Sequence, residues 1–130
     1  MRVLSPKLIE WYGNPTHWCP ACKAGHPFLV KVPNIKTSKP LWSFNGDYDR
    51  PSFAPSMRIF WTDRKTSQEH TVCHYFLTDG QIKYCEDSPH AFAGKTIDLP
   101  DFPEDQFQHY EEGSSWGQPS TPPNLTLVKK

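Results

Sequence analysis

The chain has 130 residues, enough for one domain with a modest hydrophobic core. Its 14 Lys and Arg residues balance its 14 Asp and Glu residues, so the formal net charge is zero and no basic surplus exists to hold a nucleic acid. The 14 Pro residues, about twice the usual share of roughly 5%, argue against long helices.

The first residues lack the apolar run of a signal peptide, and no segment approaches the ~18 apolar residues of a membrane span. We therefore expect a cytoplasmic protein that contacts neither a membrane nor a nucleic acid. In that reducing compartment the four Cys residues are expected to be metal ligands or free thiols, because disulfides are rare there.

The first predicted elements are a lead-in strand, a metal-binding turn and a second strand over residues 27–32, where apolar side chains alternate. The turn is Cys19-Pro20-Ala21-Cys22, and Cys-x-x-Cys with a Pro after its first Cys is typical of a zinc knuckle. Such a turn lets two thiolates bind one ion, and His26 follows closely enough to add a further ligand.

A polar connection leads to a short aromatic strand over residues 41–44, which ends at the turn signal Asn45-Gly46-Asp47. The next segment, residues 49–56, contains two Pro residues that exclude helix and predict an extended or turning path. A strand rich in large apolar residues is predicted over residues 57–62.

The clearest predicted structure is a hairpin, whose strands 71–77 and 81–85 flank the favoured turn Asp79-Gly80. With these two residues as the loop, His74 lies opposite Cys85. Side-chain alternation predicts a core face made of Cys73, Tyr75, Leu77, Ile82 and Tyr84. The opposite face carries His74, Phe76, Lys83 and Cys85.

One short helix is expected within residues 101–112, beginning near Pro103. The predicted fold class is therefore mostly β: a compact, small antiparallel β domain over residues 1–112 that contains the zinc knuckle. Ser, Pro and Gly dominate the remainder, so residues 113–130 are expected to form an extended or disordered Pro-rich tail.

Strand alternation also separates the metal ligands from the residues left for chemistry. Cys73 and His74 are adjacent, and neighbouring side chains of a strand point to opposite faces. We therefore assign Cys73 to the metal together with Cys19 and Cys22, and leave His74 on the other face.

Two residues are candidates for the fourth metal ligand, His26 and His90, and local spacing favours His26. A rival grouping joins the two knuckle cysteines to His74 and Cys85. Four protein ligands would make zinc a structural cofactor, whereas three ligands and a water molecule would make it catalytic.

A serine nucleophile is a second candidate site. Ser56 follows two Pro residues in a constrained segment, which suits the presentation of a nucleophile. Such a Ser needs a His within hydrogen-bond reach and a third group that orients this His. His74 is the natural base, and Asp87 or His90 could orient it, while Asn45 or nearby backbone amides could donate to an oxyanion.

An ordered series of short motifs connects these candidates. It comprises Trp-Ser-Phe-Asn-Gly-Asp at 42–47, Arg-Pro-Ser-Phe-Ala-Pro-Ser at 50–56, Cys-His-Tyr-Phe-Leu-Thr-Asp-Gly at 73–80, Asp-Ser-Pro-His-Ala-Phe-Ala-Gly at 87–94, and Leu99-Pro100. From about Cys19 to Pro100 the chain resembles a small family of bacterial and phage proteins often labelled ammonia monooxygenase. That label has no support in this sequence, which offers neither membrane spans nor a copper site.

Members of that family occur in phages and beside bacterial genes for ubiquitin-like conjugation, where they are suspected to be peptidases. The resemblance places Ser56, His74, Asp87 and His90 on the recurrent polar positions of the family. It places Cys19, Cys22 and His26 on the knuckle. Ser88 stands where many relatives carry Cys, so the resemblance does not support this position as a ligand.

Two hypotheses about function follow. The first is a zinc-stabilised Ser–His hydrolase, a peptidase or esterase, for which the resemblance implies the tails of ubiquitin-like proteins as substrates. The alternative is a non-catalytic zinc-binding module that binds a protein partner, such as a phage accessory factor. Zero net charge and many aromatic residues fit a protein partner better than a nucleic acid.

Overall fold

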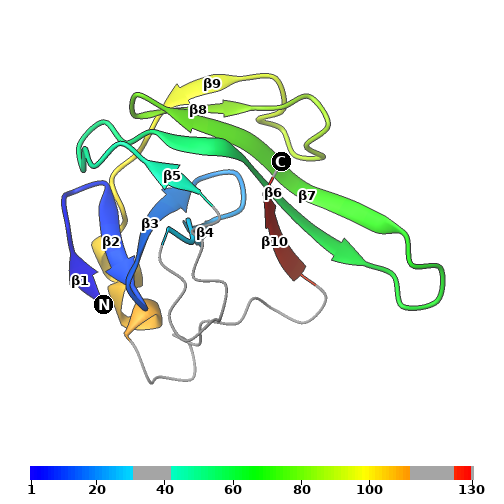
Figure 1. Ribbon diagram of the computed structural model, residues 1–130, viewed down its shortest axis with the longest axis horizontal. Coiled ribbons are helices and arrows are strands. Elements are labelled where there is room, and N and C mark those ends of the chain that lie inside the picture. Colours follow the sequence, from blue (N-terminus) through cyan, green and yellow to red (C-terminus); the bar gives the residue numbers. More distant parts are fainter. Residues whose placement is uncertain (31–41, 112–124, 130) are drawn as a thin grey trace.

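The computed structural model describes residues 1–30, 42–111 and 125–129, which form two antiparallel β-sheets (Figure 1). The smaller sheet has the order β1-β2-β3-β4, made of Arg2–Val3, Leu8–Trp11, Asn14–Cys19 and Ala24–Pro27. The larger sheet has the order β10-β6-β7-β8-β9, and β5 also pairs with β6. Its strands are Ser43–Phe44 (β5), Phe53–Thr62 (β6), Glu69–Thr78 (β7), Gln81–Tyr84 (β8), Thr96–Asp98 (β9) and Leu125–Lys129 (β10). The predicted mostly β fold is confirmed.

The predicted hairpin is confirmed in its register. Strands β7 and β8 pair Phe76 with Lys83 and Thr78 with Gln81, and the turn residue Asp79 has a φ of 50°. The pairing extends past β8, because the Cys85 amide donates to the His74 carbonyl oxygen at 2.8 Å. The predicted core face is also confirmed, since five side chains on it are buried: Cys73, Tyr75, Leu77, Ile82 and Tyr84.

The strand predicted over residues 27–32 is wrong over its described part. Strand β4 ends at Pro27, and residues 31 and 32 lie outside the described residues. The knuckle turn explains the difference, because it closes a hairpin in which Cys19 pairs with Ala24 and the ladder ends where Thr16 meets Pro27. Phe28 is nevertheless buried, and its ring stacks on Phe53 with centroids 4.0 Å apart.

In the main core, aromatic and aliphatic side chains of the larger sheet pack against Cys19 of β3 and Phe28, which follows β4. Two buried histidines of the smaller sheet lie within hydrogen-bond distance of a tyrosine of the larger sheet. The Tyr75 hydroxyl of β7 lies 2.6 Å from His17 Nε2 and 3.1 Å from His26 Nδ1. Burial lowers the pKa of His17 to about 3 and also lowers the pKa of His26, so both rings are neutral and join the sheets through hydrogen bonds.

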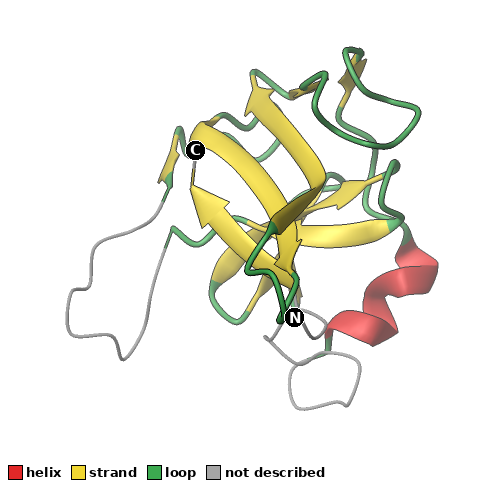
Figure 2. Cartoon of the chain, turned by 90° about the vertical axis from the view of Figure 1, so that its right-hand side faces the viewer, coloured by secondary structure: helices red, strands yellow, loops and turns green. Residues whose placement is uncertain are grey.

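The expected short helix is present as a 3-10 helix, η1 (Glu104–Tyr110), which follows Pro103. It packs beside the smaller sheet, as Figure 2 shows, where Tyr110 contacts the Trp11 ring edge-to-face. The Tyr110 hydroxyl also accepts a hydrogen bond from the Gly25 amide at 2.7 Å. Among the described residues, no helix is long and apolar enough to cross a membrane.

Residues 125–129 of the predicted tail form β10, which pairs antiparallel with β6 and places Lys129 opposite Met57. The rest of the predicted tail lies outside the described residues. One edge of β6 is therefore shared by β10 and, nearer its start, by β5.

Candidate functional site

Ser56 lies on β6 at an irregular point of the sheet. The pairing between β6 and β7 shifts register between Phe53 and Met57, so the segment that contains Ser56 departs from the regular ladder. The Trp42 indole N–H donates to the Ser56 carbonyl oxygen at 3.2 Å, and Ser56 itself is only 2% exposed. The backbone that carries this hydroxyl is therefore held from inside the core.

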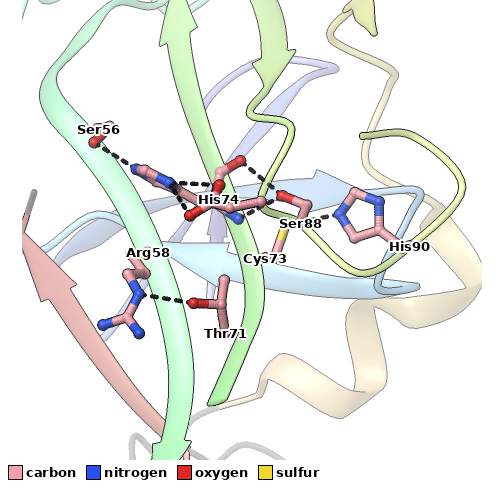
Figure 3. Close-up of polar contacts among 8 residues, drawn as sticks. Ser56, Arg58, Thr71, Cys73, His74, Ser88 and His90 are labelled. Atoms are coloured by element: carbon pink, nitrogen blue, oxygen red, sulfur yellow. Dashed lines mark hydrogen bonds and ion pairs between the residues drawn. The ribbon is translucent and has the colours of Figure 1, made fainter. Parts of the chain in front are cut away.

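Three side chains from successive parts of the larger sheet are linked by hydrogen bonds (Figure 3). Ser56 Oγ lies 3.2 Å from His74 Nε2, on the neighbouring strand β7. His74 Nδ1 lies 3.0 Å and 3.1 Å from the two carboxylate oxygens of Asp87, in the loop after β8. We call this hydrogen-bonded series of Ser56, His74 and Asp87 the relay. The His74 side chain is 17% exposed and the Asp87 side chain 56%, so the relay extends from the interior toward solvent.

A carboxylate only accepts hydrogen bonds, so the contact with Asp87 favours the His74 tautomer that is protonated at Nδ1. With Nδ1 of His74 donating to the Asp87 carboxylate, Nε2 carries the lone pair that accepts the Ser56 hydroxyl proton. The structure thus brings Ser56, His74 and Asp87 together. Of the two predicted orienting groups, Asp87 contacts His74, whereas His90 contacts Cys73.

Ser88 is a residue of this site that the sequence analysis did not identify. Its buried hydroxyl accepts from the His74 amide at 2.9 Å and donates to the His74 carbonyl at 3.0 Å. These two bonds fasten the loop that contains Asp87 to the backbone of the strand that contains His74. No sequence pattern predicts this contact, because it depends on how the loop after β8 folds back to β7.

Arg58 is a second residue that the sequence analysis missed. It pairs with His74 across β6 and β7, and its guanidinium donates to Thr71 at 2.9 Å and to Glu69 at 2.8 Å. Figure 3 shows Arg58 and Thr71 beside the Ser56–His74 pair. Because Arg58 is largely buried, these bonds hold the two strands together next to the relay.

The predicted oxyanion donor Asn45 instead organises its own loop. Its side-chain oxygen accepts from the amides of Asp47 and Ser52, and its side-chain nitrogen donates to the Arg50 carbonyl. Its backbone amide also donates to the Ser52 carbonyl at 3.1 Å. The donors of Asn45 are therefore used within the loop between β5 and β6.

Three of the four predicted metal ligands lie together on the opposite side of β7. The sulfur atoms of Cys19, Cys22 and Cys73 all lie within 4.8 Å of one another, so this group is close enough to bind a metal ion. Cys19 and Cys73 are fully buried, and Cys22 is partly buried. Three thiols in a largely buried cluster fit zinc, for which thiolates are preferred ligands.

The electrostatics of this thiol cluster also fit a cation. Hydrogen bonds from the Cys22 and Cys73 thiols lower the pKa of Cys19 below its ordinary value. The hydrogen bond to Cys19 raises the pKa of Cys22 to about 12. The pKa of Cys73 is raised in the same way by its own hydrogen bond to Cys19. The cluster by itself thus favours one thiolate, and further thiolates require a cation that compensates their charge.

The two candidates for the fourth ligand differ in their contacts. His90 Nε2 lies 3.4 Å from Cys73 Sγ, while its Nδ1 accepts a hydrogen bond from the Phe92 amide at 3.2 Å. His26 is buried and its Nδ1 lies 3.1 Å from the Tyr75 hydroxyl. A nitrogen that binds a metal carries no proton, so metal binding by His90 Nε2 leaves the ring proton on Nδ1. A protonated Nδ1 cannot accept from the Phe92 amide, and this hydrogen bond must therefore open.

The rival grouping of the knuckle cysteines with His74 and Cys85 does not correspond to the clusters found among the described residues. Ligand atoms of His74, Cys85 and Asp87 form a separate group within 4.8 Å of one another. Cys73 and His74 thus belong to different groups on opposite faces of β7, as strand alternation predicts.

A hydroxyl, an imidazole and a carboxylate linked in this order are the arrangement that serine hydrolases use on several unrelated folds. The chain belongs to the family described as bacterial ubiquitination-like system serine protease (BubE), whose family model matches residues 6–85. The matched segment contains Ser56, His74 and the three clustered cysteines, and it ends before Asp87. No curated protein and no solved structure matches the chain.

Proposed function

We propose that this protein is a zinc-stabilised serine peptidase that cleaves the C-terminal tails of ubiquitin-like proteins. The observation that carries the proposal is the hydrogen-bonded series of Ser56, His74 and Asp87. Membership of a serine protease family from a ubiquitination-like system supports the reaction class and the type of substrate.

In this reaction Ser56 Oγ attacks the carbonyl carbon of the scissile bond, and His74 Nε2 takes the hydroxyl proton. Asp87 stabilises the imidazolium that forms and keeps its ring oriented. The imidazolium then protonates the leaving amine, which departs as the acyl-enzyme ester forms. A water molecule, deprotonated by His74, hydrolyses this ester and restores the Ser56 hydroxyl.

The proposed metal site is structural, with Cys19, Cys22 and Cys73 as ligands and His90 as the fourth. Bound zinc supplies a cross-link and a positive charge that compensates the thiolates. His90 and Asp87 belong to the same loop, so ligation of His90 would also fix the loop that contributes Asp87 to the relay. His26, the ligand favoured by spacing alone, is better placed to support Tyr75.

The proposed activity is tested by labelling the purified protein with a fluorophosphonate and mapping the adduct by mass spectrometry. We expect the label on Ser56, because only a serine activated by a base reacts readily. In parallel, a ubiquitin-like protein that carries a C-terminal extension should be cut at its tail. Absence of both labelling and cleavage in metal-loaded protein would refute the proposal and favour the non-catalytic zinc module.

Replacing Ser88 should disturb the relay without touching the substrate. Ser88→Ala removes two hydrogen bonds to the backbone of His74 and should lower kcat by about 10- to 100-fold, as expected for a small misplacement of a catalytic group, with KM unchanged. Steady-state kinetics measure both constants. Ser88→Cys keeps a weak donor and acceptor and should recover part of the loss, whereas a parental kcat in Ser88→Ala would contradict this positioning role.

The second ligand group makes the active site sensitive to added metal. Excess Zn²⁺ should inhibit the enzyme, because an ion held by His74, Cys85 and Asp87 removes the lone pair or the orientation that the relay needs. Cys85→Ser removes one ligand and should raise the inhibitory concentration by about tenfold or more, with activity of the protein retained in buffer without added zinc. Equal inhibition of the parent and the variant would show that zinc acts elsewhere.

A further inference from the structure

The edge of β6 beside Ser56 is occupied by two different strands with a gap between them. Strand β5 pairs with Phe53 and Ala54, and β10 pairs with residues 57–61 on the same strand (Figure 1). Pro55 and Ser56 lie between these two paired stretches. The nucleophile of the proposed peptidase is therefore located at the junction of two edge strands.

The three groups of the proposed proton transfer follow one another across the sheet. Asp87 follows β8, His74 lies on β7 and Ser56 on β6, and β10 is the next strand outward. A substrate strand in the position of β10 would thus approach Ser56 from the side opposite His74. The hydroxyl proton can then leave toward the imidazole while Oγ attacks the carbonyl on its other side.

The register and direction of β10 agree with this geometry. Strand β10 is antiparallel to β6, and its last paired residue, Lys129, lies opposite Met57. A strand bound in the same register and extended by one residue places that residue opposite Ser56. The residues before a scissile bond would enter from the far end of β6, whereas those after it would meet β5 and have to leave the sheet edge.

We propose that the β10 edge of β6 is the binding site for the substrate segment that precedes the scissile bond, and that β10 is an intramolecular competitor for this site. This inference rests on the proposed function of Ser56. Ser56 is only 2% exposed, so a carbonyl can reach Oγ only after a neighbouring segment moves. The substrate class is an extended peptide tail that adds to the sheet as a strand.

Strand addition at this position does not require a specific substrate sequence, since main-chain hydrogen bonds supply most of the affinity. The residues of β10, Leu-Thr-Leu-Val-Lys, include several with high β-propensity and can form the same ladder as a substrate. A tethered strand acts at a high effective concentration, so β10 occupies the edge of β6 in most molecules. The apparent affinity for a free substrate is then the intrinsic affinity multiplied by the fraction of molecules in which β10 has left this edge.

The test weakens β10 in the full-length chain by proline substitution. Alternate residues of an edge strand direct their N–H groups toward the partner, so only one of Leu127→Pro and Val128→Pro removes a ladder bond, and the other is its matched control. The probe is a fluorescent peptide with the sequence of residues 125–129. Its binding is measured by anisotropy in a Ser56→Ala background, where no reaction can occur.

We expect the disrupting proline to tighten binding of the peptide by about tenfold relative to the control proline and to the parent. In the corresponding proteins that retain Ser56, the bound peptide should inhibit hydrolysis of p-nitrophenyl acetate. Equal binding by all three proteins, or tighter binding without inhibition, would overturn the proposal. If no protein hydrolyses the ester, the proposed function fails, while the binding experiment still decides whether β10 exchanges.

Circular dichroism verifies that the variants are folded. If the disrupting proline unfolds the domain, the double variant Leu127→Gly and Val128→Gly replaces it, because glycine weakens the strand through backbone entropy and keeps every N–H group. The same tightening of peptide binding is expected from this variant. Its absence would show that β10 is a fixed part of the sheet.

Discussion

Ser56→Ala is expected to lower kcat/KM for tail cleavage by roughly 10⁴- to 10⁶-fold, the range found when the nucleophile of a serine protease is removed. Only the Oγ atom is lost, so the remaining hydrogen bond of His74 to Asp87 should persist. The loss of one buried hydrogen bond changes the free energy of unfolding by only about 1 kcal/mol. Cleavage assays and thermal melts on the same preparation separate the two effects.

The matched control is Ser43→Ala, which removes a hydroxyl from the neighbouring strand β5 and should leave cleavage within about twofold of the parent, as expected for an exposed substitution. His74→Ala should be as inactive as Ser56→Ala, and the double variant should be no worse, because the two groups act as one unit. Activity of Ser56→Ala within tenfold of the parent would remove Ser56 from the mechanism.

The part of this site that follows from the sequence is the part governed by strand alternation. The Asp79-Gly80 turn determines the register of the hairpin, and the register determines that Cys73 and His74 face opposite sides. The separation of a thiol cluster from an imidazole relay was therefore predictable without coordinates. The same rule predicts the buried face of the hairpin.

The contacts that depend on loops and on distant segments could not be predicted in this way. Ser88 meets His74 because the loop after β8 folds back over β7, and no local pattern encodes such a return. The pairing of β10 with β6 joins segments far apart in the sequence, across residues whose composition predicts no regular structure. Local spacing likewise favoured His26 as a ligand, whereas the three-dimensional contact with Cys73 is made by His90.

The second large effect is expected from loss of the metal. Cys22→Ser should abolish zinc binding and lower the melting temperature by more than about 10 °C, because structural zinc in a small domain contributes folding free energy directly. The three clustered thiols join the turn between β3 and β4 to β7, so we expect loss of a metal bound between them to detach part of the smaller sheet from the larger one. Elemental analysis and thermal melts with and without a chelator measure both quantities.

Cys85→Ser is the matched control, since it makes the same change of side chain at a thiol outside the cluster of Cys19, Cys22 and Cys73. It should retain one zinc ion per chain and the parental melting temperature. His74→Ala should also retain zinc, whereas His90→Ala should weaken zinc binding, because His90 is the proposed fourth ligand. Loss of zinc from His74→Ala would contradict the separation of the two sites, because the imidazole assigned to proton transfer would then be a ligand. Zinc bound by Cys22→Ser with parental affinity would instead show that the three clustered thiols do not form the metal site.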